Sequence, residues 1–117
     1  MAENPDRIKK LFHDDKANKE GIFAINITKN GIKQQVVIDD QIPCMHHGRP
    51  AFSRSNGDEM WVMVLEKAWA KLHSTYQRID GGQAFHTLRD LSGAPSFELI
   101  IADEKENGLW NKILKYD

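Results

Sequence analysis

The sequence has a single cysteine, Cys44, among its 117 residues, so an internal disulfide framework is excluded. A lone thiol is typical of proteins in reducing compartments, and we therefore expect a cytoplasmic (intracellular) location. Long apolar runs are lacking as well, which predicts no membrane span. The first residues also lack the charged and then apolar pattern of a signal peptide.

An excess of charge of either sign is lacking too. Sixteen basic side chains are opposed by 17 acidic ones, which gives a formal net charge of −1. Because nucleic-acid binding depends on lysine and arginine neutralising phosphates, no nucleic-acid partner is expected. The chain is 40% hydrophobic and 28% charged, which is ordinary for a globular protein, and its length suits one domain or part of one.

The most apolar segment predicts a helix over residues 55–72. Asn56 suits the N-cap, and Glu59, three residues later, suits the returning hydrogen bond of a capping box. One face has the spacing of a buried helix: Trp61, Val64, Leu65, Ala68 and Leu72. Further apolar residues surround its first turns: Met60, Val62 and Met63. This pattern predicts a central helix that is buried on more than one side.

Two alternating segments flank Asn30-Gly31 and predict an antiparallel β-hairpin over residues 22–29 and 32–39. Asn-Gly favours a two-residue type I′ turn because both central residues must adopt positive φ. This turn fixes the register, which would pair Ile25 with Val36 and Phe23 with Ile38 on one face.

Shorter elements complete an α+β fold in which flanking helices and a hairpin surround the central helix. A first helix is predicted to begin at Asn4-Pro5, and a short one covers residues 84–91. A strand over residues 97–101 and a last amphipathic helix around Leu109 and Leu114 follow.

Several groups suggest chemistry but fit a structural role better. Cys44 lies near His46 and His47 on one loop, whereas catalytic pairs usually meet from distant segments, and a metal site would need further ligands. A plain surface loop is the favoured interpretation. Asp39 and Asp40 would point to opposite faces of an extended segment, so the two carboxylates cannot share a proton or a metal ion. A structural role at the end of the strand is the favoured interpretation.

Four blocks in register resemble calpain-type (papain-like) cysteine proteases. They are VVIDDQIP (36–43), the acid-to-LEKAWAKL stretch (59–72), Tyr76 with Gly81-Gly82, and LRDLSG (88–93). The resemblance implies an internal fragment of a papain-like catalytic domain. Residues 1–80 would be the late part of the first catalytic subdomain, and residues 81–117 the start of the second.

The resemblance also gives two residues a role. Gly82 matches the glycine that hydrogen-bonds the substrate backbone in the family, although a plain turn is the alternative. Glu59 matches an acid of a calcium site in the parent family, with Met60 where the family often has phenylalanine. The other ligands lie upstream in the family, so the site is incomplete and no calcium is expected to bind this chain alone.

The family's catalytic cysteine, histidine and asparagine match no residue here, so no catalytic residue is assigned. The expected function is a fragment of a calcium-dependent cysteine endopeptidase, inactive alone; the alternative is a non-catalytic calpain-like protein-interaction module. Its partner would be the rest of the protease catalytic domain or another protein. Self-association is expected through an exposed apolar patch around Met60, Val62, Met63 or Trp110.

Overall fold

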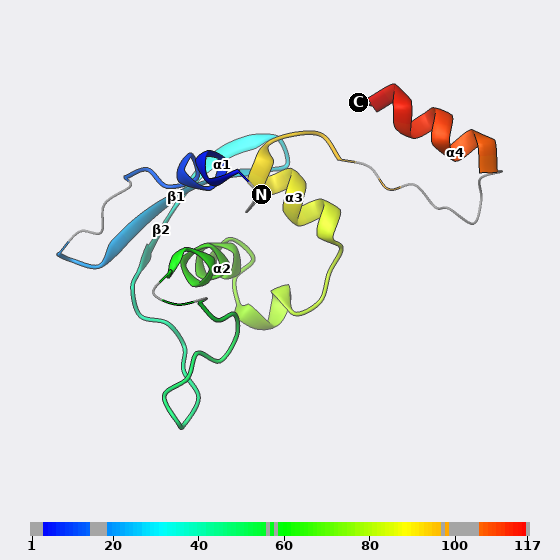
Figure 1. Cartoon of the computed structure of the whole chain (residues 1–117). Helices are drawn as coiled ribbons and strands as arrows, with labels where there is room; N and C mark the ends of the chain where they lie inside the picture. The colour runs from blue at the N-terminus through cyan, green and yellow to red at the C-terminus, as the bar shows by residue number, and fades with distance from the viewer. Residues whose placement is uncertain are drawn as a thin grey trace.

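The computed structural model describes residues 4–14, 19–55, 57, 59–96, 98 and 106–116. The described elements in chain order are α1 (Pro5–Lys9), β1 (Ile22–Lys29), β2 (Ile32–Asp39), α2 (Trp61–Leu72), the 3₁₀ helix η1 (Tyr76–Ile79), α3 (Ala84–Ser92), α4 (Glu106–Ile113) and the 3₁₀ helix η3 (Leu114–Tyr116). They form a mixed α+β arrangement, as predicted (Figure 1). The proposed cap Asn56 and most of the proposed strand 97–101 lie outside the described residues.

The hairpin has the predicted register, with Ile25 opposite Val36 and Phe23 opposite Ile38. Asn30 (φ 51°) and Gly31 (φ 79°) form the turn, as a type I′ geometry requires. The segment after α1 pairs with the free edge of β1, because Asn26 N donates to Leu11 O at 2.6 Å. This extra edge pairing was not predicted.

The central helix begins later than predicted, because α2 begins at Trp61 and not near residue 55. Met60 is the N-cap, and it makes no side-chain capping hydrogen bond. Gly57 has φ +75°, a left-handed conformation that an α-helix cannot include. The predicted capping box is therefore wrong, and Glu59 precedes the helix.

The core lies between α2 and one face of the hairpin. Its buried members are Leu11, Ile25, Ile27, Val36, Ile38, Val64, Leu65 and Ala68. Trp61 and Trp69 are half-buried and pack against this core, which for Trp61 confirms the predicted apolar face. Lys71 Nζ donates to Val37 O at 2.6 Å, so the polar side of α2 is also fastened to β2.

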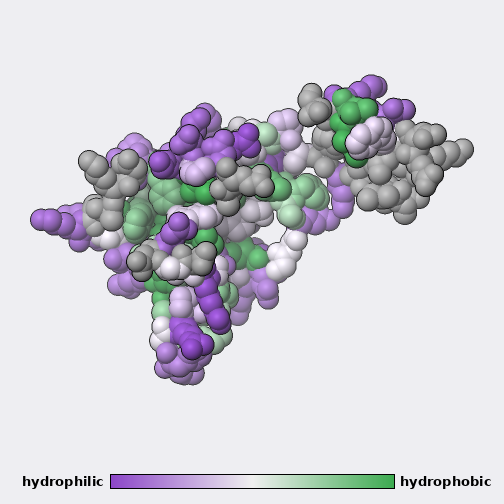
Figure 2. Space-filling view, in the orientation of Figure 1, coloured by the Kyte–Doolittle hydropathy of each residue, from purple (hydrophilic) through white to green (hydrophobic). Residues whose placement is uncertain are grey.

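The predicted apolar patch is present only in part. Met60 and Trp110 are 44% and 62% exposed, whereas Met63 is buried, so the prediction was wrong for Met63. Figure 2 shows apolar surface on the main body and on α4. Figure 1 shows α4 apart from the other elements, and the radius of gyration of 17.0 Å exceeds the roughly 13 Å of a compact domain of this length.

Among the described helices, none combines the length and the apolarity needed to cross a bilayer.

Candidate functional site at the Gly81-Gly82 link

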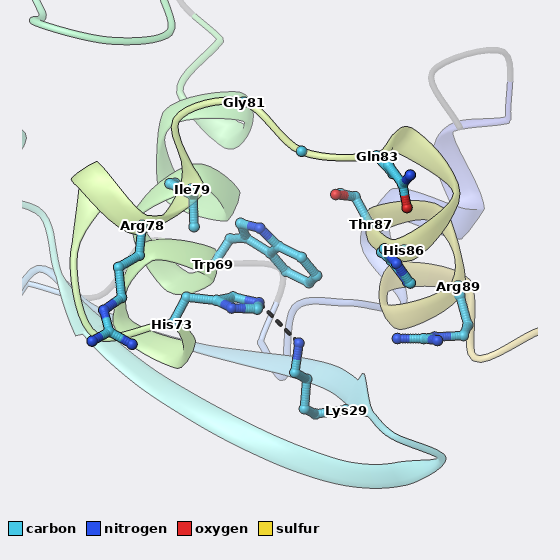
Figure 3. A pocket seen from close by; sticks show the side chains of 11 residues that line it. Lys29, Trp69, His73, Arg78, Ile79, Gly81, Gln83, His86, Thr87 and Arg89 are labelled. Carbon is cyan, nitrogen blue, oxygen red and sulfur yellow. Dashed lines mark hydrogen bonds between the residues drawn. The ribbon is translucent and has the colours of Figure 1, made fainter.

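A cavity of about 310 Å³ opens where the end of α2, the η1–α3 link, α3 and the end of β1 meet (Figure 3). Eleven residues line it: Lys29, Trp69, His73, Arg78, Ile79, Gly81, Gly82, Gln83, His86, Thr87 and Arg89. The cavity therefore brings Gly82, the candidate substrate-binding residue, together with side chains from β1, α2, η1 and α3.

Gly81 and Gly82 separate η1 from α3 with left-handed backbone, at φ +76° and +119°. Residues other than glycine rarely adopt such backbone angles. A Cβ atom added at Gly82 would meet no heavy atom within 4 Å, so the space beside its Cα is open. The Gly82 backbone is thus accessible to a second chain at the edge of the cavity.

Asp90 does not line the cavity itself, but it pairs with two residues that do, and its side chain is only 1% exposed. Lys29 Nζ donates to its Oδ2 at 3.1 Å, and Arg89 Nε donates to its Oδ1 at 2.9 Å. Burial raises the pKa of Asp90, but the hydrogen bonds from Arg89 and Lys29 outweigh burial and hold this pKa below its usual value. Asp90 is therefore a carboxylate that joins α3 to β1.

His73 lies beside the same lysine, with Lys29 Nζ 3.0 Å from His73 Nε2. Burial lowers the pKa of His73, and the charge of Lys29 lowers it further. The lowered pKa favours the neutral ring at neutral pH, and in the tautomer with an unprotonated Nε2 this nitrogen accepts a hydrogen bond from the Lys29 ammonium group. His73 also contacts Trp69, whose ring lies 5.4 Å from Lys29 Nζ. His73 is thus a half-buried histidine with polar and aromatic partners, while His86 is exposed and also lines the cavity.

Glu59 lies at the opposite end of α2. The 12 residues of that helix place its ends about 18 Å apart. Glu59 is exposed, and its Oε2 accepts a hydrogen bond from Trp61 Nε1 at 3.1 Å. The described residues contain no group of three or more histidine, cysteine, aspartate or glutamate side chains that could hold a metal ion. The part of the chain described here thus shows no calcium site, and calcium binding by Glu59 stays a prediction.

Cys44 lies on the exposed loop after β2, which extends away from α2 and α3 in Figure 1. Its Sγ donates to Ile42 O at 3.4 Å, and His46 and His47 are exposed on the same loop. These three residues thus lie on a surface loop, as predicted. Cys44 is not among the residues that line the cavity.

Asp39 ends β2 in a structural role, as predicted. Its carboxylate accepts hydrogen bonds from Lys67 Nζ and from Gln41 N. These bonds lower the pKa of Asp39, the one from Lys67 most strongly. The hydrogen bonds from Lys67 and Gln41 go to the carboxylate of Asp39 and not to that of the adjacent Asp40.

Lys29 and Asp90 were not identified from the sequence, because 61 residues separate them. The local signal is weak: a lysine just before the Asn30-Gly31 turn, and an Arg-Asp pair inside a short helix. Neither distinguishes a buried ion pair from an exposed charge.

The sequence of the chain is similar to calpains. The calpain family cysteine protease domain matches residues 1–117. The calpain-type cysteine protease DEK1 of Arabidopsis thaliana is 36% identical over 117 residues, covering 94% of this chain and 5% of that protein. Calpain-10 of Rattus norvegicus is 40% identical over 76 residues, covering 64% and 11%. Calpain-5 of Mus musculus is 31% identical over 102 residues, covering 81% and 16%.

The chain thus spans a small part of the length of these relatives, while the family match extends over all of its residues. The blocks that suggested the resemblance fall within this match. The chain belongs to the calpain family of cysteine proteases.

Proposed function

We propose that this chain forms part of the papain-like catalytic domain of a calcium-dependent cysteine endopeptidase. In this proposal, residues 1–80 belong to the first catalytic subdomain and residues 81–117 begin the second. Family membership supports it, as does the break in helical structure at Gly81-Gly82. The rest of the catalytic domain is then the partner, calcium acts in the parent enzyme, and the single exposed thiol suits a cytoplasmic setting.

One observation carries the proposed role in substrate binding. Gly82 borders the cavity, has a left-handed backbone, and has open space where a side chain would lie. An extended peptide binds through main-chain hydrogen bonds, so it needs a backbone that it can approach closely. Gly82 provides one beside a cavity that accepts a side chain.

We expect a capped, uncharged hexapeptide at millimolar concentration to shift the amide resonance of Gly82 in ¹⁵N NMR spectra of the chain. In the Gly82→Ala variant, the peptide should no longer shift the amide resonance of residue 82, because the added methyl group occupies the space through which the peptide approaches. Gly48→Ala is the matched control, since Gly48 also has positive φ and an open Cβ position but lies on the loop after β2. Peptide shifts that survive Gly82→Ala would contradict this role.

The chain alone is expected not to cleave peptides, because Cys44 is exposed, is not among the residues that line the cavity, and does not match the family's nucleophile motif. A fluorogenic peptidase assay with EDTA and with about 1 mM calcium should show no turnover in either condition. The Cys44→Ala variant should behave identically. Turnover that disappears in this variant would make Cys44 a nucleophile and would overturn the assignment.

The alternative is a non-catalytic calpain-like module that binds a protein partner. The exposure of Met60 and of Trp110 supports it, because large apolar side chains in contact with water favour association. A chain that neither cleaves peptides nor binds them at Gly82 would favour this alternative.

A further inference from the structure

The charge of the cavity points to the kind of peptide that it accepts. Three permanent cations line it, Lys29, Arg78 and Arg89, and the lining residues include no aspartate or glutamate. The buried Asp90 pairs with Lys29 and Arg89, so it offsets one of these charges. The remaining excess is positive, and in a partly enclosed space it is less screened than on an open surface.

Hydrogen bonds to the described residues use only some of the donors of these cations. Arg89 donates its Nε–H to Asp90, and a guanidinium carries five N–H donors in all. In Figure 3 the Arg89 guanidinium extends into the gap between α2 and α3, toward Lys29. Asp90 pairs with both Lys29 and Arg89, which orients these cations before any ligand arrives. A preoriented pair loses less side-chain entropy on binding than two free surface cations.

We propose that this cavity binds an acidic side chain of a peptide whose backbone lies along Gly82. The substrate class would then be peptides that carry a carboxylate at the position facing Arg89 and Lys29. This inference rests on the proposed function, because it assumes that Gly82 holds a peptide.

A free anion such as phosphate offers the same oxygen chemistry. The shared position of Gly82 and the cations in one cavity favours a carboxylate attached to a peptide. Backbone contacts at the glycine and an ion pair in the cavity would then act on one molecule.

The test compares two capped hexapeptides that differ by one central residue, glutamate or glutamine, with inorganic phosphate as a third ligand. Binding to the chain is followed by ¹⁵N NMR at low ionic strength. The glutamate peptide should bind about fivefold more tightly, since a partly exposed ion pair contributes about that much. Arg89→Gln should remove this preference, Arg78→Gln should reduce it, and Arg49→Gln, which removes an exposed charge from the loop after β2, should leave it unchanged.

Equal binding of both peptides at Gly82 would overturn the acidic preference and leave the proposed peptide site standing. Phosphate shifts without any preference for the glutamate peptide would likewise overturn it, and would reduce the cavity to a site for free anions. If neither peptide shifts Gly82, the proposed peptide site fails and this inference fails with it. Should Arg89→Gln not fold, the wild-type chain decides: a preference for the glutamate peptide that is unchanged at about 1 M salt, where charges are strongly screened, overturns the proposal.

Discussion

Replacing Ile25 by alanine is expected to lower the free energy of unfolding by about 2–5 kcal/mol. Ile25 is fully buried at the centre of β1, between the segment that carries Leu11 and the face of α2 that carries Val64. The shortened side chain loses its transfer free energy and leaves a cavity, because three elements hold the surrounding atoms in place. Chemical denaturation followed by circular dichroism measures this loss.

Ile32→Ala is the matched control, because Ile32 lies in the same hairpin and is 65% exposed. Its effect should stay within about 0.5 kcal/mol. A small domain has roughly 5–15 kcal/mol of stability in total, so the Ile25 variant should be partly unfolded at moderate temperature. Equal losses for the two variants would show that the hairpin does not pack on α2 as described.

The hairpin also connects stability with the candidate site. Lys29 is the last residue of β1, and it contacts Asp90 and His73 across the cavity. Loss of hairpin packing in the Ile25 variant should therefore weaken peptide binding at Gly82. The reason is that Lys29, although not itself replaced, would no longer be held against α3.

The hairpin was predictable because its determinants are local. Asn30-Gly31 sets the turn, and the alternation of Ile25 and Ile27 sets the face. The start of α2 was not predictable from the same kind of reasoning. Glu59 fits a capping box by spacing, yet its carboxylate accepts a hydrogen bond from Trp61, and Gly57 adopts a conformation that interrupts the helix.

The candidate site was also predictable only in part. Gly82 was identified through a motif of the family, since nothing in the glycine pair alone distinguishes a substrate contact from a turn. The burial of α3 contradicts simple hydropathy: Leu88 is 51% exposed, whereas Asp90 is 1% exposed. This reversal depends on two cations, one of them from a strand 61 residues away, which no local pattern contains.

Asp90→Asn is expected to lower the free energy of unfolding by about 2–3 kcal/mol at pH 7. Removing one partner of a buried ion pair costs more than the pair itself contributes, because the other charges lose their compensation. The cost here is at the lower end, since the side chains of Lys29 and Arg89 are 26% and 32% exposed and can be hydrated.

The pH dependence identifies the charge as the cause. The folded-state pKa of Asp90 lies below its ordinary value of 3.8, so the unfolded chain takes up the proton first. The stability from Asp90 is therefore complete above that ordinary value and is lost as pH falls through the folded-state pKa. The gap between wild type and Asp90→Asn should be widest near pH 6 and should narrow below about pH 4. The contribution of Asp39 to stability is lost in the same pH window, but it is lost equally in the wild type and in Asp90→Asn, so it does not change the gap between them.

Asp80→Asn is the control for this experiment, because Asp80 is exposed and is not among the cavity residues. It should change the free energy of unfolding by less than about 0.5 kcal/mol at every pH. A gap for Asp90→Asn that stays constant from pH 6 to pH 3 would mean that shape and not charge makes Asp90 important. Lys29 and Arg89 would then not be held by an ion pair, and the orientation of both cations toward the cavity would need another cause. A gap that narrows as expected ties the stability of α3 to the charges that line the site.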